Sequence, residues 1–173
     1  MKLKKYKKIS STNKIAKAMK MPEPWMVIWA EEQEAGYGRE KDYWFSPKGG
    51  LYFSVVLPKS TIEDLQILTI LAAFVVAKVL KENFKVEPMI KLPNDVYLNQ
   101  KKIAGILTEA VVGQDVKFSI MGIGLNTNID KFPRDLENIA TSLKIELGKK
   151  VNNKKLIKKI VEDIKKQLEA ISE

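Results

Sequence analysis

The chain has 173 residues, of which 45% are hydrophobic and 29% are charged, and its formal net charge at pH 7 is +9. This composition excludes a disordered chain, and the length favours one domain, residues 1–173, over two. The chain contains no cysteine and no histidine, which excludes disulfides and the Ser-His-Asp and Cys-His types of catalysis and disfavours a zinc site.

The positive charge comes almost wholly from lysine, since Arg39 and Arg134 are the only arginines. A solvated lysine-rich surface is the plainer explanation, and nucleic-acid binding is the alternative. No basic helix interleaved with aromatic residues supports that alternative, so we expect no nucleic-acid partner. The N-terminus has no apolar signal region, and the most apolar run, residues 67–80, contains Thr69 and Lys78 and is too short to span a bilayer. We expect a cytoplasmic protein without a membrane partner.

The spacing of apolar residues, glycines and prolines predicts the secondary structure in chain order. Strands cluster after two early helices with hairpins among them, which predicts an α+β fold: a mixed, largely antiparallel sheet with helices on one face. The elements expected are strands 2–9, 25–30, 51–57, 89–92, 96–98, 102–112 and 116–123, a helix after residues 11–13, a centrally buried helix starting at Ser60 or Thr61 with Glu63 and Asp64 in its first turn, a short helix from Thr141 or Ser142 to Gly148, and a final helix 153–171.

A long loop with four glycines, residues 34–50, separates two of these strands. Loops of this length in compact domains are usually functional or disordered. Gly36 and Gly38 flank Tyr37, and Arg39 follows; glycines let backbone N–H groups approach an anion, and arginine binds carboxylate or phosphate bidentately. Trp44 is suited to covering a flat ring. An unstructured surface loop is the alternative, because G-x-G alone is a weak signal.

The stretch KLPNDVYLNQKKIAGIL places Lys91, Asp95 and Lys102 around a predicted hairpin turn. Regular alternation puts Lys102 and Gly105 on opposite faces of their strand. A twist or bulge near Gly105 would bring the Lys102 amine into the same cleft, where the glycine leaves the backbone open. A solvated turn is the plainer alternative for these lysines.

Two further stretches carry polar residues at element ends. In MGIGLNTN, Gly122 and Gly124 alternate with apolar residues before Asn126, which indicates either a site with open backbone or tight packing against the central helix. Ser11, Thr12 and Asn13 precede the first helix, where a plain N-cap is the alternative to a binding role.

Together and in order, ISSTN, EEQEAGYGR, W-x-SP-x-GGLYFS, K-x-PND, K-x-AGIL-x-E and G-x-G-x-N-x-N resemble the catalytic core of biotin protein ligases, from about residue 9 to residue 128. The resemblance implies the fold of the biotin/lipoate ligase catalytic domain, which is like that of class II aminoacyl-tRNA synthetases. It also implies that biotin and ATP, with Mg²⁺, form biotinyl-5′-AMP, and that biotin is then transferred to one lysine of a biotin carboxyl carrier protein.

The resemblance also implies roles for individual residues. Lys102, Arg39, Lys91 and Asp95 are the expected catalytic residues: Lys102 neutralises the biotin carboxylate and the α-phosphate, Lys91 contacts phosphate, and Asp95 binds Mg²⁺ or orients amine transfer. The expected biotin site comprises Ser11, Thr12, Asn13, Gln33, Gly36, Tyr37, Gly38, Arg39, Lys102 and Gly105. The expected ATP site comprises Arg39, Trp44, Lys91, Asn94, Asp95 and Asn126.

The chain departs from the family pattern in three ways. The loop reads GYGREKD where the family reads close to GRGRRGR, and Leu92 replaces the tryptophan of KWPND. We also expect neither an N-terminal helix-turn-helix nor a C-terminal SH3-like domain. Two alternatives therefore stay open: a biotin- or biotinyl-AMP-binding module with weak transfer, and a lipoate or octanoate transferase of the same fold. Relatives often dimerise through sheet edges, and the predicted edge strands permit a homodimer.

Overall fold

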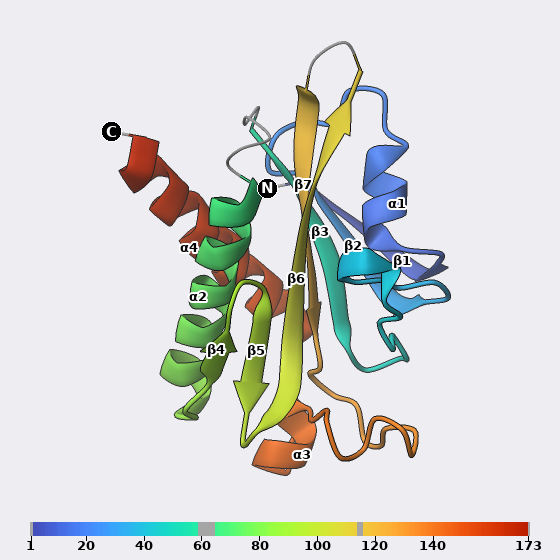
Figure 1. Cartoon of the computed structure of the whole chain (residues 1–173), viewed down its shortest axis with the longest axis vertical. Helices are drawn as coiled ribbons and strands as arrows, with labels where there is room; N and C mark the ends of the chain where they lie inside the picture. Colours follow the sequence, from blue (N-terminus) through green and yellow to red (C-terminus); the bar gives the residue numbers. More distant parts are fainter. Residues whose placement is uncertain (1, 59–64, 114–115, 173) are drawn as a thin grey trace.

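The computed structural model describes residues 2–58, 65–113 and 116–172 (Figure 1). One seven-stranded sheet has the strand order β1-β2-β3-β7-β6-β5-β4. Strands β1 and β2 are parallel and every other neighbouring pair is antiparallel, which confirms the predicted α+β fold with a mixed, largely antiparallel sheet. The elements are β1 Leu3–Ile9, α1 Thr12–Lys17, β2 Val27–Gln33, a 3₁₀ turn Arg39–Lys41, β3 Leu51–Leu57, α2 Leu65–Phe84, β4 Met89–Lys91, β5 Asp95–Leu98, β6 Lys101–Val112, β7 Val116–Leu125, α3 Leu143–Leu147 and α4 Asn153–Ser172.

Helices α2 and α4 lie together on one face of the sheet (Figure 1). Alternate strand residues such as Val27, Phe53 and Leu125 are fully buried beneath them and form the main core. The described part of α2 is less enclosed than predicted, because Ile67 and Phe74 are each 58% exposed on its outer side. The expectation of a centrally buried helix was therefore wrong. The start predicted for this helix at Ser60 or Thr61, with Glu63 and Asp64 in the first turn, lies outside the described residues.

Helix α1 packs on the opposite face of the sheet, which corrects the prediction that the helices share one face. Ala16 of α1 packs against Ile28, Val56 and Ile120 in a second, smaller core. The helix belongs to the connection between the parallel strands β1 and β2, and such a pair needs a crossover instead of a tight hairpin. The start of α1 is thereby brought beside the middle of the sheet.

A β-bulge in β6 sets the direction of its side chains. Tyr97 of β5 pairs with Lys102, whereas the preceding Val96 pairs with Ala104, so Ile103 is an extra residue. The extra residue resets the alternation, and Lys102 and Gly105 therefore point to the same side of the sheet. The bulge predicted near Gly105 is confirmed. None of the helices in the described residues has the length and apolar character needed to cross a membrane.

Candidate active site

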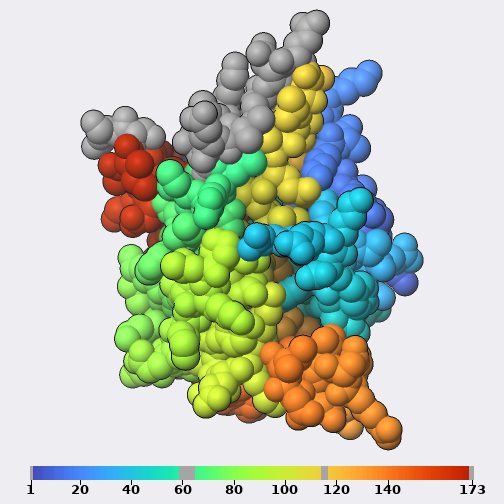
Figure 2. Space-filling model, in the orientation of Figure 1, coloured from blue at the N-terminus to red at the C-terminus, as the bar shows by residue number. Residues whose placement is uncertain are grey.

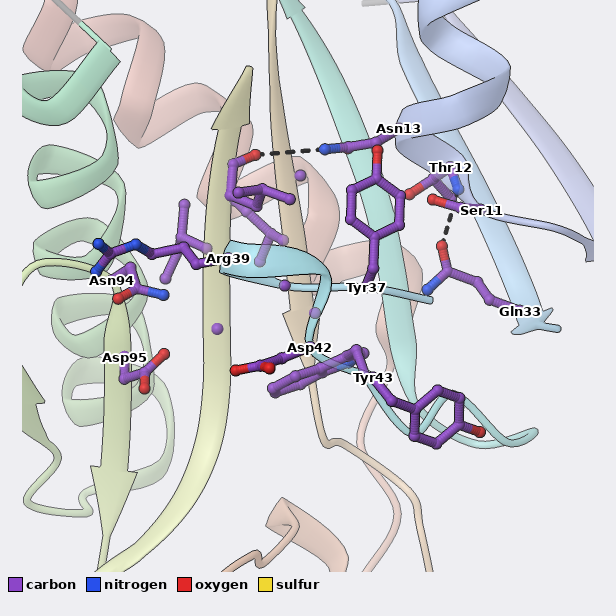
Figure 3. Close-up of a pocket in the computed structure, with 18 of the residues that line it drawn as sticks. Ser11, Thr12, Asn13, Gln33, Tyr37, Arg39, Asp42, Tyr43, Asn94 and Asp95 are labelled. Carbon is purple, nitrogen blue, oxygen red and sulfur yellow. Dashed lines mark hydrogen bonds between the residues drawn. The ribbon is translucent and has the colours of Figure 1, made fainter. Parts of the chain in front are cut away.

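A cavity of about 280 Å³ lies on the face of the sheet opposite to α2 and α4. A hairpin formed by residues 36–44 covers part of it and reaches across to the strands β5 and β6 (Figure 2). The cavity brings together most of the predicted site residues: Ser11, Thr12, Asn13, Gln33, Tyr37, Gly38, Arg39, Trp44, Asn94, Asp95, Lys102 and Gly105. Residues from the first helix, the glycine loop and the KLPND stretch thus meet in one place (Figure 3).

The floor of the cavity is made of glycines on two paired strands. Gly105 of β6 lies opposite Gly124 of β7, and the indole of Trp44 covers both. A Cβ at Gly124 would lie 2.4 Å from Trp44 Nε1, and one at Gly105 would lie 3.1 Å from its Cζ3. Within the described residues the buried Trp44 N–H has no hydrogen-bond partner. These glycines therefore let a flat ring lie against the backbone.

One end of the cavity is polar and internally ordered. Gln33 Oε1 accepts from the Thr12 backbone N–H at 2.8 Å, and Gln33 Nε2 donates to Ser46 Oγ at 2.9 Å. The Ser54 hydroxyl donates to Asn13 Oδ1 at 2.5 Å and lies 2.8 Å from the Thr12 hydroxyl. Since buried polar groups are costly unless paired, this network fixes the shape of the end wall.

Ser11 stands apart from that network. It is only 3% exposed and lines the cavity. Ser11 is the N-cap residue of α1, as the alternative expected, but its side chain makes no capping hydrogen bond. No described residue hydrogen-bonds to its hydroxyl. A nearly buried hydroxyl that faces a cavity without a partner is suited to a polar ligand.

The other end of the cavity is charged. Lys102 Nζ lies 2.7 Å from Asp95 Oδ1 and 5.3 Å from the centroid of the Trp44 ring. The Lys102 backbone is fixed as well, because its N–H donates to Ile139 and its carbonyl accepts from Thr141. The side chain is 29% exposed, so the ammonium is partly withdrawn from water, where its field on an anion is strengthened.

The glycine loop is folded in this structure. The Gly38 N–H donates to the Asp42 carbonyl at 2.8 Å and the Trp44 N–H donates to the Gly36 carbonyl at 3.0 Å. Glu40 and Lys41 have φ values of 55° and 66°, which turn the chain at the tip. A Cβ at Gly36 would lie 2.5 Å from Ser46 Oγ, so the hairpin base requires a glycine. Arg39 extends from the tip across β6 (Figure 3).

Sequence reasoning assigned no role to Glu109 of β6, which forms a hydrogen bond between the hairpin and the sheet. The Tyr37 hydroxyl donates to Glu109 Oε2 at 2.8 Å. Burial, and then this carboxylate, raise the pKa of Tyr37 above its ordinary value. The available signal was an acidic residue within the otherwise apolar stretch AGILTEAVV. Ser46 and Ser54 were also missed, because nothing in a lone serine of a strand or loop marks it as an end-wall residue.

Three predicted site residues do not line the cavity. Gly36 lies at the hairpin base. Lys91 is exposed, pairs across the sheet with Asp95, and places its Nζ 5.7 Å from the centroid of the Tyr97 ring. Asn126 is 3% exposed, and its backbone bonds Ile103 and Leu143. The roles expected for Lys91 and Asn126 on ATP stay predictions.

The described residues contain no group of three or more Asp or Glu side chains that could hold a metal ion. Asp95 offers a single carboxylate, and Lys102 already pairs with it. These side chains do not form a resident cation site. They fit the usual binding of Mg²⁺, which takes one or two carboxylates and obtains its other ligands from substrate phosphates and water.

Comparison with known proteins adds a family and relatives. The model of the biotin/lipoate A/B protein ligase family matches residues 6–126. The bifunctional ligase/repressor BirA of Bacillus subtilis is 38% identical over 161 residues, which are 88% of this chain and 49% of BirA. BirA of Escherichia coli is 30% identical over 148 residues, 81% of this chain and 44% of that protein. The chain thus spans about half the length of these curated relatives.

The fold also has a similar solved structure. The biotin protein ligase from Aquifex aeolicus, in complex with biotin and ATP, superimposes with a TM-score of 0.89 at 32% sequence identity. The match covers 97% of this chain and 70% of that one.

Proposed function

Because this chain belongs to the biotin/lipoate A/B protein ligase family, we propose that it activates biotin with ATP to biotinyl-5′-AMP and transfers biotin to a lysine of a biotin carboxyl carrier protein. The observation that carries the proposal is the Lys102 ammonium. It lies inside a cavity that is also lined by the nearly buried Ser11, whose hydroxyl has no hydrogen-bond partner among the described residues. An elongated molecule with a polar head and an anionic tail matches the polar and charged ends of the cavity.

The first step joins two anions. A biotin carboxylate oxygen attacks the α-phosphorus of ATP, an O–P bond forms, and the bond from the α-phosphorus to the bridging oxygen of pyrophosphate breaks. The protein needs to align the reactants and offset their charge. We assign charge neutralisation to Lys102 and Arg39, which both line the cavity. Trp44, which lies against Gly105 and Gly124, separates this centre from solvent on the hairpin side.

In the second step the amine of the acceptor lysine attacks the acyl carbon, and AMP leaves with the electrons of the cleaved C–O bond. The attacking amine must be neutral and must approach the same centre. We assign its orientation to Asp95, the only carboxylate paired with Lys102 among the described residues. The proton that the amine loses passes to solvent, and AMP departs as an anion.

The polar end supports biotin over lipoate. The ureido head of biotin has one carbonyl and two N–H groups, which match the remaining capacity of Gln33 and the Ser11 hydroxyl, to which no described residue bonds. The dithiolane ring of lipoate has no strong donor or acceptor. Its binding would leave the Ser11 hydroxyl desolvated and unpaired, and sites built for hydrogen bonding reject such ligands strongly.

Magnesium would enter with ATP as part of the substrate. Bound there, it supplies positive charge to the phosphate oxygens. We propose that Asp95, the carboxylate beside Lys102 in the cavity, would supply the protein ligand to that ion. Asn94 also lines this end, and we assign it to the nucleotide.

Exchange of labelled pyrophosphate into ATP tests the proposal. We expect the purified chain to catalyse this exchange only when biotin and Mg²⁺ are present, and lipoate to replace biotin poorly. Biotin should then appear on an added carrier domain. Exchange that is absent with biotin, or equal with lipoate, would refute the assignment.

A second candidate is a biotin-binding module with weak transfer. It is favoured by Glu40 and Asp42, which line the cavity beside Arg39 and offset its charge. Calorimetry that detects biotin binding, combined with no biotin on the carrier domain, would support this candidate.

A further inference from the structure

The Glu109 carboxylate of β6 lies outside the cavity lining and joins its strand to the hairpin and to α1. Oε2 accepts from Tyr37 of the hairpin at 2.8 Å and from Asn13 Nδ2 of α1 at 2.7 Å, and Oε1 accepts from Lys17 of α1. The carboxylate is 21% exposed. Charge-assisted hydrogen bonds of this kind are among the stronger ones in proteins. Glu109 itself does not line the cavity described above.

Tyr37 fixes the hairpin to α1 as well as to β6. The Nζ atoms of Lys14 and Lys17 each lie 5.7 Å from the centroid of its ring, a distance at which cations are attracted to an aromatic face. The same hairpin carries Arg39 and Trp44 into the cavity. The hairpin cannot leave the cavity without breaking the contacts of Tyr37.

Glu109 also reaches the polar end wall through Asn13. Asn13 Nδ2 donates to Glu109, and its Oδ1 accepts from Ser54. A Cβ at Gly122 would lie 2.3 Å from Asn13 Oδ1, so this amide covers the strand backbone there. One carboxylate therefore sets the orientation of an end-wall residue and the position of the covering hairpin.

We infer that Glu109 is a positioning residue that fastens the hairpin over the cavity through Tyr37 and thereby slows the release of a bound ligand. The identity of that ligand rests on the proposed function, but the fastening does not.

Hydrogen exchange tests the fastening without any ligand. The Trp44 and Gly38 amides are bonded across the hairpin and report its opening. In Tyr37→Phe we expect both to exchange about tenfold faster, the loss of one hydrogen bond to a charged group, while amides of β3 keep their rates. Tyr43→Phe is the matched control: Tyr43 lies opposite Tyr37 in the hairpin, is 67% exposed, and its hydroxyl bonds no described residue.

A double-mutant cycle separates fastening from general loosening. Glu109→Leu, which removes both acceptor oxygens, should alone accelerate the same amides, and adding Tyr37→Phe should accelerate them little further, because both variants remove the Tyr37–Glu109 hydrogen bond. Additive effects, or unchanged exchange in Tyr37→Phe, would overturn the inference.

Ligand release is measured in the same variants by stopped flow with biotin. We expect release from Tyr37→Phe to be about tenfold faster than from the wild type and from Tyr43→Phe. Faster hairpin exchange with unchanged biotin release would overturn the link between fastening and retention. If the wild type binds no biotin, the proposed function fails, and the exchange data alone decide whether Glu109 fastens the hairpin.

Discussion

The two faces of strand β7 differ as sharply as any two regions of this molecule. Leu125 is fully buried in the main core, whereas its neighbour Gly124 opens the backbone beneath Trp44 on the other face. Apolar side chains on the first face hold α2 and α4 to the sheet. On the second face Gly122 and Gly124 carry no side chain, and polar groups from distant segments line a cavity, while Ile120 of the same strand packs in the smaller core beneath α1. We therefore expect that truncation in the main core beneath α2 and α4 changes stability most, and that changes at Gly124 affect the cavity most.

The largest effect on stability is expected from Leu125→Ala. Truncating a fully buried leucine costs about 3 kcal/mol of unfolding free energy, because it removes buried surface and leaves a void. Denaturant unfolding measures this loss. The folded protein should still bind biotin within about twofold of the wild-type affinity, since hydrophobic truncation on the core face leaves the other face intact. If Leu125→Ala lost biotin affinity together with stability, the contrast between the two faces of β7 would be contradicted.

Gly124→Ala should have the opposite pattern. The new methyl would lie 2.4 Å from Trp44 Nε1, so the ring must leave the floor of the cavity. We expect biotin affinity to fall about tenfold, or about 1.4 kcal/mol, with the unfolding free energy changed by less than about 1 kcal/mol. Calorimetry and unfolding are measured on the same preparation. Normal biotin affinity in Gly124→Ala would show that biotin binding does not need a glycine at this position beneath Trp44.

Ser11→Ala tests whether the Ser11 hydroxyl at the polar end of the cavity binds the ligand. Because the nearly buried Ser11 hydroxyl has no partner among the described residues, its removal should not destabilise the protein. It should weaken biotin binding about fivefold, the loss of one hydrogen bond of about 1 kcal/mol. Ser10→Ala is the control, since Ser10 does not line the cavity. Equal effects of the two substitutions would remove Ser11 from the site.

Lys91 is expected to give the smallest effect. It is exposed and lies outside the cavity lining, although it pairs across the sheet with Asp95. If it contacts phosphate, Lys91→Met should raise KM for ATP about threefold, as for an exposed charge contact, and leave KM for biotin unchanged. Steady-state exchange at varied ATP measures this, and an unchanged KM for ATP would reject the phosphate role.

Much of the fold followed from local patterns. Strand periodicity and hairpin turns predicted β4 to β7 and the final helix. A twist or bulge near Gly105 was expected if Lys102 and Gly105 face one cleft, and the structure contains the bulge. The position of α1 was not predictable in the same way, because a short amphipathic segment does not reveal which face of a sheet it will cover. The exposed side of α2 was missed because a helix that is apolar on most faces does not reveal whether another element covers its outer side.

Part of the candidate site could be predicted from the sequence for a similar reason. Gly105, Gly124 and Lys102 follow local rules of strand geometry, so their spacing could be interpreted. Glu109 acquires its meaning only when Tyr37 and Lys17, both far away in the sequence, are folded against it. The lack of a capping hydrogen bond from the Ser11 side chain could not be foreseen, since a serine before a helix ordinarily makes one.

Replacing the ammonium of Lys102 tests the central claim most directly. Lys102→Met keeps most of the side-chain stem, and Lys101→Met is the adjacent control, because Lys101 Nζ donates to the Glu137 carbonyl outside the cavity. We predict that Lys102→Met lowers biotin-dependent pyrophosphate exchange by at least about a hundredfold, or about 3 kcal/mol of transition-state stabilisation. The control should stay within about twofold. Nearly equal exchange by the two variants would contradict the assignment of the reacting centre to Lys102.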